Sequence, residues 1–335
     1  MKNRYSRIVL KQTGQQDLDV IRGKNNELII NVRSSKNDRF KTPPIPKGYR
    51  YVCGKWNDGF VIERKIDRSQ FVWVPVGSLK SNGTLDGIHY SEKFGRRKWR
   101  MNNEYDSDKL YFDPLTKEFI EQVESVDKYQ GFYVSRFNIS RNKKTNKQQS
   151  VRNEYPLGGW NFFEIEDRAY YFEKQDTVKS HLLFGCEYDS ILEWFMDSGA
   201  RSKDEIFKDS SNWGHFSESL ESYKKRYNDY LKTDYWNDPA YWRCYGDEIP
   251  ISRDESERKK TGTSEEWQTN RIYDLAGNLL EVTQERHFTR LEAPEIVCRG
   301  TNYLDEKYRT VVARRIGKDN SCLDHCSYRI ALWIK

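Results

Sequence analysis

The apolar positions of this chain gather in short runs that predict strands, and only a few stretches show helical spacing. The run Phe71–Val76 predicts a buried strand, and Pro75 places it at a sheet edge or at a strand end. The runs Tyr49–Cys53 and Phe60–Ile62 flank a turn that contains Asp58-Gly59, which predicts a β-hairpin. Further strands are predicted at residues 27–33, 131–139, 271–273, 295–299, 311–315 and 329–334.

Three stretches have apolar residues at the spacing of an amphipathic helix. They predict helices over residues 115–128, 187–195 and 217–231, and Gly199 closes the second of these. Asn161 precedes Glu164 by three residues, and this capping box predicts a further helix over residues 163–174. The strands and helices neither alternate regularly nor form a strand-only meander. The predicted fold class is therefore α+β, with much irregular structure.

The composition indicates an ordered globular protein with an uneven charge. Aromatic residues make up 14 % of the 335 residues, which argues against disorder although 32 % of the residues are charged. The formal net charge is +6, yet residues 1–50 alone carry twelve Lys/Arg against four Asp/Glu. Pro43, Pro44 and Pro46 then interrupt any regular structure. We predict a basic N-terminal extension, residues 1–42, followed by one domain, residues 43–335.

The apolar runs are too short for membrane insertion or for a secretory leader. No run approaches 18 apolar residues, and the run Ile8–Leu10 is too short for the core of a signal peptide. We therefore expect no signal peptide, no membrane association and a cytoplasmic protein as synthesised. In a reducing compartment, the six scattered cysteines are expected to be small buried hydrophobic residues.

An ordered set of motifs resembles the formylglycine-generating enzyme (sulfatase-modifying factor) family, whose domain is a variant of the C-type-lectin fold. The sharpest match is Ile272–Thr283, similar to the family pattern L-Y-D-M-x-G-N-V-W-E-W-T. The other matching segments are residues 71–77, 131–137, 187–195, 299–303 and 328–331. The segments Ile45–Tyr49 and Arg329–Lys335 most resemble leaderless proteins of low-GC Gram-positive bacteria and their phages, mostly without assigned activity. The resemblance covers residues 43–335.

The residues at the positions of the family's copper ligands argue against copper chemistry in this protein. Family enzymes hold copper between two cysteine thiolates shortly after the Arg-Gly motif, and two soft thiolates suit Cu(I). In register on Arg299, the two cysteine positions are Asp305 and Thr310, and the family serine becomes Asn302. Neither Asp nor Thr replaces a thiolate for Cu(I). We therefore expect neither bound copper nor formylglycine-generating activity, and no catalytic residue is assigned.

Displaced cysteines leave an alternative open. Cys298, Cys322 and Cys326 lie near the same region of the sequence, so a metal-dependent oxygenase with displaced ligands is the alternative function. The segment Cys322–Cys326 also contains His325, but a zinc site needs four ligands, and Cys298 is the only further candidate nearby. We interpret the segment as a surface turn with one packed cysteine, and a disulfide between Cys322 and Cys326 requires an oxidising compartment.

The turn in the sharpest motif is the candidate metal site. The resemblance implies a calcium ion held by the Asp274 and Glu281 carboxylates and by the backbone carbonyls of Gly277 and Leu279. Such an all-oxygen set suits a hard cation. The alternative is a structural turn without an ion, in which Asn278 adopts the left-handed conformation. The dipeptide Asn212-Trp213 resembles part of a second family calcium site.

A dense group of aromatic residues is the candidate recognition surface. Rigid amphipathic rings give contact area at low entropic cost, so they suit a protein or glycan ligand, although packing on the domain would also explain them. The group contains Tyr223, Tyr227, Tyr230, Tyr235, Trp236, Tyr241, Trp242 and Tyr245, and we add Asn302 and Tyr303 beside the Arg-Gly motif.

The remaining patterns exclude several function classes. The sequence contains no Walker A, Gly-x-Gly-x-x-Gly, His-Glu-x-x-His or Gly-x-Ser-x-Gly motif. The five histidines are expected to be surface or structural residues. The basic extension carries no recognition motif, so nucleic acid is not expected as a partner.

We predict a non-catalytic binding or structural protein on this lectin-type scaffold, encoded by a phage or prophage. It would lie on a virion or tail surface and recognise a host glycan or protein. The basic extension would contact other virion proteins.

Overall fold

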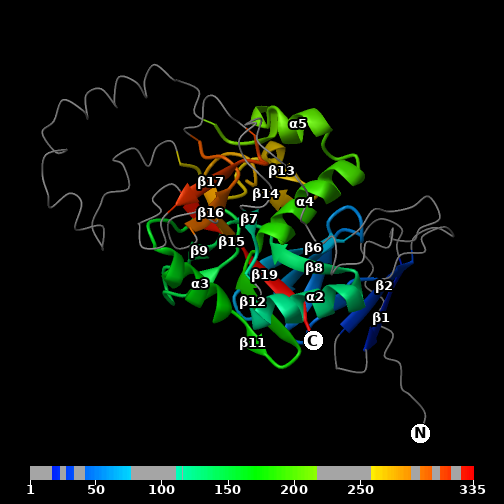
Figure 1. Ribbon diagram of the computed structural model, residues 1–335. Coiled ribbons are helices and arrows are strands. Elements are labelled where there is room, and N and C mark those ends of the chain that lie inside the picture. Colours follow the sequence, from blue (N-terminus) through cyan, green and yellow to red (C-terminus); the bar gives the residue numbers. More distant parts are fainter. Residues whose placement is uncertain are drawn as a thin grey trace, which may run out of the picture.

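The computed structural model describes nine stretches of the chain (Figure 1). They are residues 17–22, 28–33, 42–76, 111–114, 116–216, 258–287, 295–303, 310–317 and 326–335. The helix predicted at 217–231 lies outside them, as do residues 77–110.

A seven-stranded antiparallel sheet forms the centre of the molecule. Its spatial order is β11 (Lys174–Gln175), β12 (Val178–Leu182), β19 (Ile330–Ile334), β8 (Gly131–Ser135), β6 (Gln70–Pro75), β5 (Val61–Arg64) and β4 (Tyr49–Cys53). The predicted hairpin is confirmed as β4 and β5. Pro75 ends β6 opposite Gly131, which confirms the strand-end alternative of the prediction. The strand is not at the sheet edge, because β6 pairs with β5 and β8.

Both faces of this sheet are buried. On β6, Phe71 and Trp73 enter one hydrophobic core, whereas Val72 and Val74 enter a second core on the opposite face. Strands buried on both faces have no polar positions to alternate with apolar ones. This explains why the sequence of β6 is a continuous apolar run.

Helices cover the face that carries Val72 and Val74. The helix α2 (Lys117–Tyr129) packs against β8 and β19, and α4 (Gly185–Asp197) packs against β6. The short helix α5 (Lys203–Phe207) follows α4 in the chain and contacts it. The predicted helices at 115–128 and 187–195 are thus confirmed.

The opposite face meets a helix and a second sheet. The helix α3 (Phe162–Tyr170) starts with the predicted capping box, in which the Glu164 amide donates to Asn161 Oδ1 at 3.0 Å. The second sheet has the order β17 (Arg314–Gly317), β16 (Glu295–Arg299), β15 (Leu280–His287) and β18 (Cys326–Tyr328), and β7 (Tyr111–Phe112) also pairs with β15. Figure 1 shows this second sheet and α3 on the same side of the central sheet.

Short elements complete the described structure. They are β1 (Asp17–Arg22), β2 (Leu28–Arg33), β3 (Pro44–Ile45), β9 (Ser140–Arg141), β10 (Gln148–Gln149), β13 (Gln268–Thr269), β14 (Ile272–Tyr273) and the 3₁₀ helices η2 (Ser211–Trp213) and η4 (Glu265–Trp267). The strand predicted at 27–33 is β2, which pairs with the unpredicted β1 and with β3. The strand predicted at 311–315 lies instead at β17.

The molecule is a sheet-rich α+β protein, as predicted at the level of fold class. Among the described residues, no helix has the length and apolar character needed to cross a lipid bilayer.

Candidate functional site

The motif at 272–283 forms a tight turn that joins β14 to β15. Asp274, Gly277 and Asn278 have φ angles of 56°, 72° and 57°, so all three are left-handed. For Asn278 this conformation is the one predicted under the alternative of a structural turn without an ion. The Asn278 side chain fixes the turn, because its amide nitrogen donates to the Lys259 carbonyl (3.1 Å) and its oxygen accepts from the Lys259 amide (3.2 Å). A Cβ on Gly277 would lie 2.1 Å from the His215 carbonyl oxygen. Only glycine fits there.

Glu281 forms a buried ion pair with Arg329. The Nε of Arg329 donates to Oε1 of Glu281 at 2.6 Å, and the Asn138 amide donates to the same oxygen at 3.2 Å. The Arg329 guanidinium also donates to the carbonyl oxygens of Ser135 (3.0 Å) and Tyr273. Both charged side chains are at most 1 % exposed. A buried pair of this kind is stable only when further hydrogen bonds support it. Here the Arg329 guanidinium and Oε1 of Glu281 have such bonds.

Two carboxylate oxygens of this motif find no hydrogen-bond donor among the described residues. Oδ2 of Asp274 accepts from the Thr261 hydroxyl (2.6 Å) and from the Gly262 amide (2.8 Å). Oδ1 of Asp274 and Oε2 of Glu281 are buried and have no hydrogen-bond partner within the described stretches. Burial raises the pKa of both carboxyl groups, and the Asp274 charge adds to the rise at Glu281.

This donor chemistry fits a hard cation such as calcium, since unsatisfied buried oxygens are costly and calcium prefers oxygen ligands. The backbone carbonyls of Gly277 and Leu279, also expected as ligands, belong to the same turn. Arg329 already supplies one positive charge to Glu281.

The second calcium motif has packing partners. The Asn212 amide donates to Oε1 of Glu205 on α5 at 3.2 Å. Trp213 is buried in the same core as Leu275 and Ala276 of the turn, and the Arg201 guanidinium lies 4.7 Å from its ring centroid. Trp213 thus supports the turn by packing.

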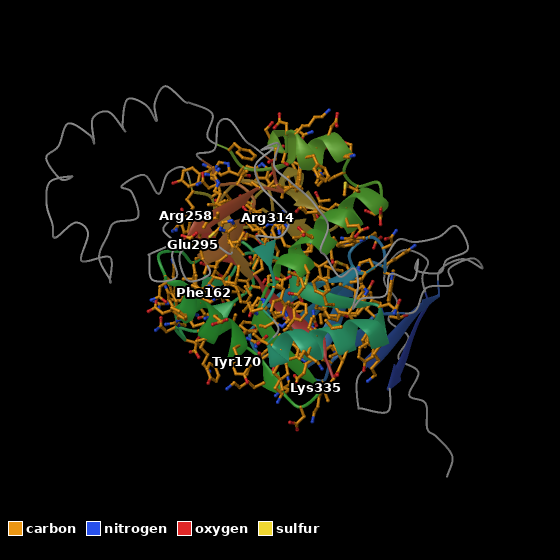
Figure 2. All side chains as sticks on the ribbon, viewed as in Figure 1. Phe162, Tyr170, Arg258, Glu295, Arg314 and Lys335 are labelled. Carbon is orange, nitrogen blue, oxygen red and sulfur yellow. The ribbon has the colours of Figure 1, made fainter. Side chains whose placement is uncertain are left out.

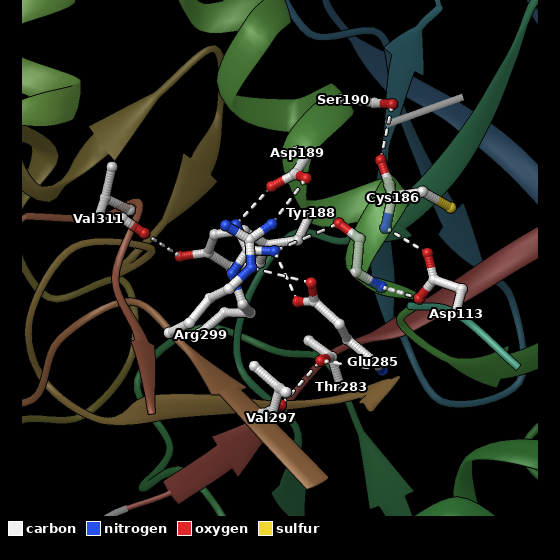
Figure 3. A network of polar contacts seen from close by, with 12 residues as sticks. Asp113, Cys186, Tyr188, Asp189, Ser190, Thr283, Glu285, Val297, Arg299 and Val311 are labelled. Carbon is white, nitrogen blue, oxygen red and sulfur yellow. Dashed lines mark hydrogen bonds and ion pairs between the residues drawn. The ribbon is translucent and has the colours of Figure 1, made fainter. Parts of the chain in front are cut away.

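Arg299 of the Arg-Gly motif is the centre of a buried charge network (Figure 3). It donates to Asp189 on α4 and to Oε2 of Glu285 at 2.9 Å on β15. Arg314 binds the same two carboxylates, at 3.1 Å from Asp189 and 2.9 Å from Glu285. Burial acts to raise the pKa of Glu285, but Arg314 and Arg299 outweigh it and hold that pKa below its usual value. The network joins α4, β15, β16 and β17.

Asp113 caps the N-terminus of α4 beside this network. Its two oxygens accept from the amides of Gly185 (2.7 Å) and Cys186 (2.9 Å), as Figure 3 shows. Burial, with the nearby Glu285 charge as a second cause, raises the pKa of Asp113 to about 7. The pKa of the Cys186 thiol is raised by burial and by Asp113, so this thiol is not activated as a nucleophile.

Two of the displaced cysteines meet. Cys298 on β16 and Cys326 on β18 flank β15, and their sulfur atoms lie 3.5 Å apart in the core. Of the family copper positions, Thr310 is buried and Asp305 lies outside the described residues, as does Cys322. In the described parts of the chain, no group of three or more His, Cys, Asp or Glu side chains is arranged to hold a metal ion.

His181 forms a hydrogen-bonded pair with Glu187 that was not predicted from the sequence. Nε2 of His181 lies 2.9 Å from both carboxylate oxygens of Glu187, and Gln122 and the Phe184 amide (2.8 Å) also donate to this carboxylate. Glu187 is the third residue of α4 and His181 is the penultimate residue of β12, so a strand-to-helix turn brings them together. An acidic residue in the first turn of a predicted helix was the available signal.

A cavity of about 340 Å³ opens between α2, α3 and β12, with His181 at its wall. Its other walls include the acidic side chains Glu118, Glu166 and Asp167 and the aromatic side chains Phe163 and Tyr170. In Figure 2, Tyr170 lies between α3 and α2.

The expected recognition surface is described only in small part. Tyr223, Tyr227, Tyr235, Trp236, Tyr241 and Trp242 lie outside the described residues. Asn302 and Tyr303 are buried, at 7 % and 4 % exposure, and His215 stacks on Tyr303. Placing these two residues on a surface was wrong, because the Tyr303 amide donates to the Asn278 carbonyl and draws the segment against the turn.

The comparisons with known proteins give remote structural likenesses. No protein-family model matches the sequence, and no curated protein sequence matches it. The structure of PvdO from Pseudomonas aeruginosa is similar at a TM-score of 0.40 and 12 % identity, over 84 % of this chain and 100 % of that chain. The crystal structure of CarF is similar at a TM-score of 0.40 and 9 % identity, over 80 % of this chain and 99 % of that chain.

Proposed function

We propose that this protein is a non-catalytic binding protein on a formylglycine-generating-enzyme-like, C-type-lectin-type scaffold. The observation that carries the proposal is that the charged side chains of the family-like motifs form ion pairs inside the protein. Glu281 is bonded to Arg329, and Arg299 is bonded to Asp189 and Glu285, all of them buried. Because these charges are paired with one another, we infer that they hold the loops in place. They are not presented to a substrate.

The ligand is proposed from the sequence. The aromatic segment 223–245 would recognise a host glycan or protein, and the basic extension would dock the protein on other virion components. The phage or prophage assignment rests on the resemblance of Ile45–Tyr49 and Arg329–Lys335 to phage-associated proteins. Incorporation into a virion would then follow synthesis in the cytoplasm.

A binding assay tests this proposal. Fluorescently labelled full-length protein is titrated on a panel of intact low-GC Gram-positive cells. We expect saturable binding to some strains and at least a tenfold loss for a Trp236→Ser/Trp242→Ser variant. The matched control is Tyr155→Ser, which removes a 39 % exposed aromatic residue elsewhere. Absence of saturable binding on every strain, or equal losses in both variants, would count against the proposal.

Calcium is proposed as a structural ion at the turn. The support is a pair of buried oxygens that have no donor in the described part of the chain, Oδ1 of Asp274 and Oε2 of Glu281. Elemental analysis of the purified full chain should find about one calcium per molecule, and Glu281→Ala should lose it. Chelation should lower the melting temperature of the wild type. If the wild-type protein contains no calcium and its melting temperature does not change when calcium is added, the proposed calcium site is wrong.

A second candidate function is favoured by the thiol pair. Cys298 and Cys326 offer two soft ligands 3.5 Å apart, which suits Cu(I), so a metal-dependent oxygenase with displaced ligands is the alternative. Under this alternative, Cu(I) binding measured by elemental analysis would be lost in Cys298→Ser and kept in Cys186→Ser. Cys186 is a matched control because it is equally buried but unpaired with another cysteine in the described structure. Equal copper content in both variants eliminates the displaced site.

A further inference from the structure

The hairpin of β9 and β10 displays positive charge on an ordered turn. The turn carries three exposed lysines, Lys143, Lys144 and Lys147. The side-chain oxygen of Asn142 accepts from the amides of Lys144 (3.0 Å) and Thr145 (3.1 Å). The Asn142 amide donates to the Lys147 carbonyl at 2.8 Å and closes the turn. A ligand that pairs with these lysines therefore meets a backbone that is already fixed by hydrogen bonds.

The described chain supplies no ion-pair partner to these three lysines, whereas Arg152, which follows β10, pairs with Glu265. The sequence explains the difference, because no acidic residue occurs between Asp127 and Glu154. Like charges that lie close together repel one another, and a bound anion removes that repulsion.

Neighbouring segments lie beside the hairpin and extend its surface. Ser140 of β9 forms a bridge with Pro156. The Thr261 amide donates to the Glu154 carbonyl at 2.9 Å, so the chain around Thr261 lies against the same segment. In Figures 1 and 2, β9 and Arg258 lie on the same side of the molecule.

Positive charge is concentrated on these segments, residues 139–157 and 258–262, which form the basic face of the domain. They carry eight Lys/Arg and one acidic residue. By contrast, residues 51–335 have a formal charge of −2, because residues 1–50 hold +8 of the total of +6. The basic face is therefore a local excess on a nearly neutral domain, and clustered charge of one sign attracts a ligand of the opposite sign.

The side chains of the basic face favour an anionic glycan over a nucleic acid. Tyr155, its only aromatic residue, is 39 % exposed, and Nζ of Lys260 lies 5.4 Å from the ring centroid. Single-stranded nucleic acids stack successive bases on several rings, which one tyrosine does not provide. Asn142, which could read a base edge, is engaged in holding the turn. An anionic polysaccharide needs only cations for its acidic groups and one ring for a sugar face.

We infer that the basic face is a binding surface for an anionic polysaccharide. The acidic groups of the polymer pair with the lysines of the turn and with Lys260, and a sugar ring lies against Tyr155. This surface uses different residues from the aromatic segment 223–245, so a failed cell-binding test leaves the inference standing.

The experiment compares matched polymers on the full chain by calorimetry. Dextran sulfate is compared with neutral dextran of the same chain length, and a single-stranded oligodeoxynucleotide with the same number of charges represents nucleic acid. We expect dextran sulfate to bind at least tenfold more tightly than dextran and more tightly than the oligonucleotide, with an affinity that falls as salt is added. Equal affinities for the two dextrans, including no binding of either, overturn the inference. Oligonucleotide binding that is as tight as that of dextran sulfate, or tighter, also overturns it.

Variants at the turn place the binding on the basic face. Lys143→Glu/Lys144→Glu should weaken dextran sulfate binding at least tenfold and make it less sensitive to salt. Lys65→Glu/Lys203→Glu is the matched control, because it reverses two exposed lysine charges outside the basic face, and it should stay within twofold of wild type. Both variants keep the basic extension, so its contribution cancels, and circular dichroism checks that both fold. Unchanged affinity in the turn variant, or equal losses in the two variants, overturns the assignment.

Discussion

At the scale of single residues, the buried ion pairs explain why the most family-like motifs are polar. Glu281 and Arg329 lie 48 residues apart in sequence, and Arg299 and Asp189 lie 110 apart. From the resemblance, Glu281 was expected to be a metal ligand, and Arg299 served only to align the Arg-Gly motif. Pairings over such separations have no local signal in one sequence, so the internal partners of these charges were not predicted.

The Glu281–Arg329 pair gives a stability prediction. Glu281→Gln should lower the free energy of unfolding by about 3–5 kcal/mol, because it leaves the Arg329 charge buried without a counter-charge. Adding Arg329→Met should cost less than the sum of the two single changes. Chemical denaturation of the two single variants and the double variant measures this coupling.

A pair with one exposed partner provides the control for this cycle. Arg50 pairs with Glu63, but its side chain is 48 % exposed. Arg50→Met should therefore change the free energy of unfolding by no more than about 1 kcal/mol. Equal losses for Arg50→Met and Glu281→Gln would contradict the importance of burial.

Asp113 predicts a pH dependence. Burial raises its folded-state pKa to about 7 from an ordinary value of 3.8, so folding favours the protonated carboxyl. The stability contributed by this group is therefore lost as the pH rises through that window. Compared with wild type, Asp113→Asn should gain up to about 4 kcal/mol between pH 4 and pH 8. Denaturation curves at several pH values measure the difference, and parallel stability profiles for the two proteins would refute it.

At the scale of elements, the sequence predicted helices from local patterns better than it predicted which strands pair. The capping box of α3 and the helical spacing of α2 identified both helices, because these patterns need only residues a few positions apart. The strand β17 begins at Arg314, three residues after the predicted start, because its register is set by pairing with β16. Pro75 lies at the end of β6, one of its two predicted positions; the choice between a strand end and a sheet edge depends on pairing with β8, which is a tertiary property.

Two glycines test the turn between β14 and β15. Gly277 and Gly199 have the same φ of 72°, but a Cβ on Gly199 would meet no atom of the described residues within 4 Å, whereas one on Gly277 would meet the His215 backbone. Gly199→Ala should cost about 1–2 kcal/mol, the price of a left-handed alanine. Gly277→Ala should cost several kcal/mol more, because the backbone must move. Thermal unfolding of both variants decides, and equal melting temperatures would show that the close approach does not matter.

At the scale of the whole molecule, a sheet buried on both faces holds a loop-rich second layer in place. The continuous apolar runs predicted the buried strands, and the turn and Arg-Gly motifs lie together in the layer that contains β15 and β16. The sequence did not reveal that Cys298 and Cys326 would meet across β15, nor that His181 would face a cavity beside α3. Both depend on how strands from distant parts of the chain are ordered.

The most direct test of the proposed non-catalytic role is a turnover measurement. The full-length protein is incubated with Cu(I), oxygen and a cysteine-containing sulfatase peptide, and the peptide mass is followed by mass spectrometry. We predict no change in peptide mass, because the family copper positions carry Asp305 and Thr310 in place of cysteine. Conversion of the cysteine thiol, abolished by Cys298→Ser but not by Cys186→Ser, would contradict this account and establish the displaced-ligand oxygenase.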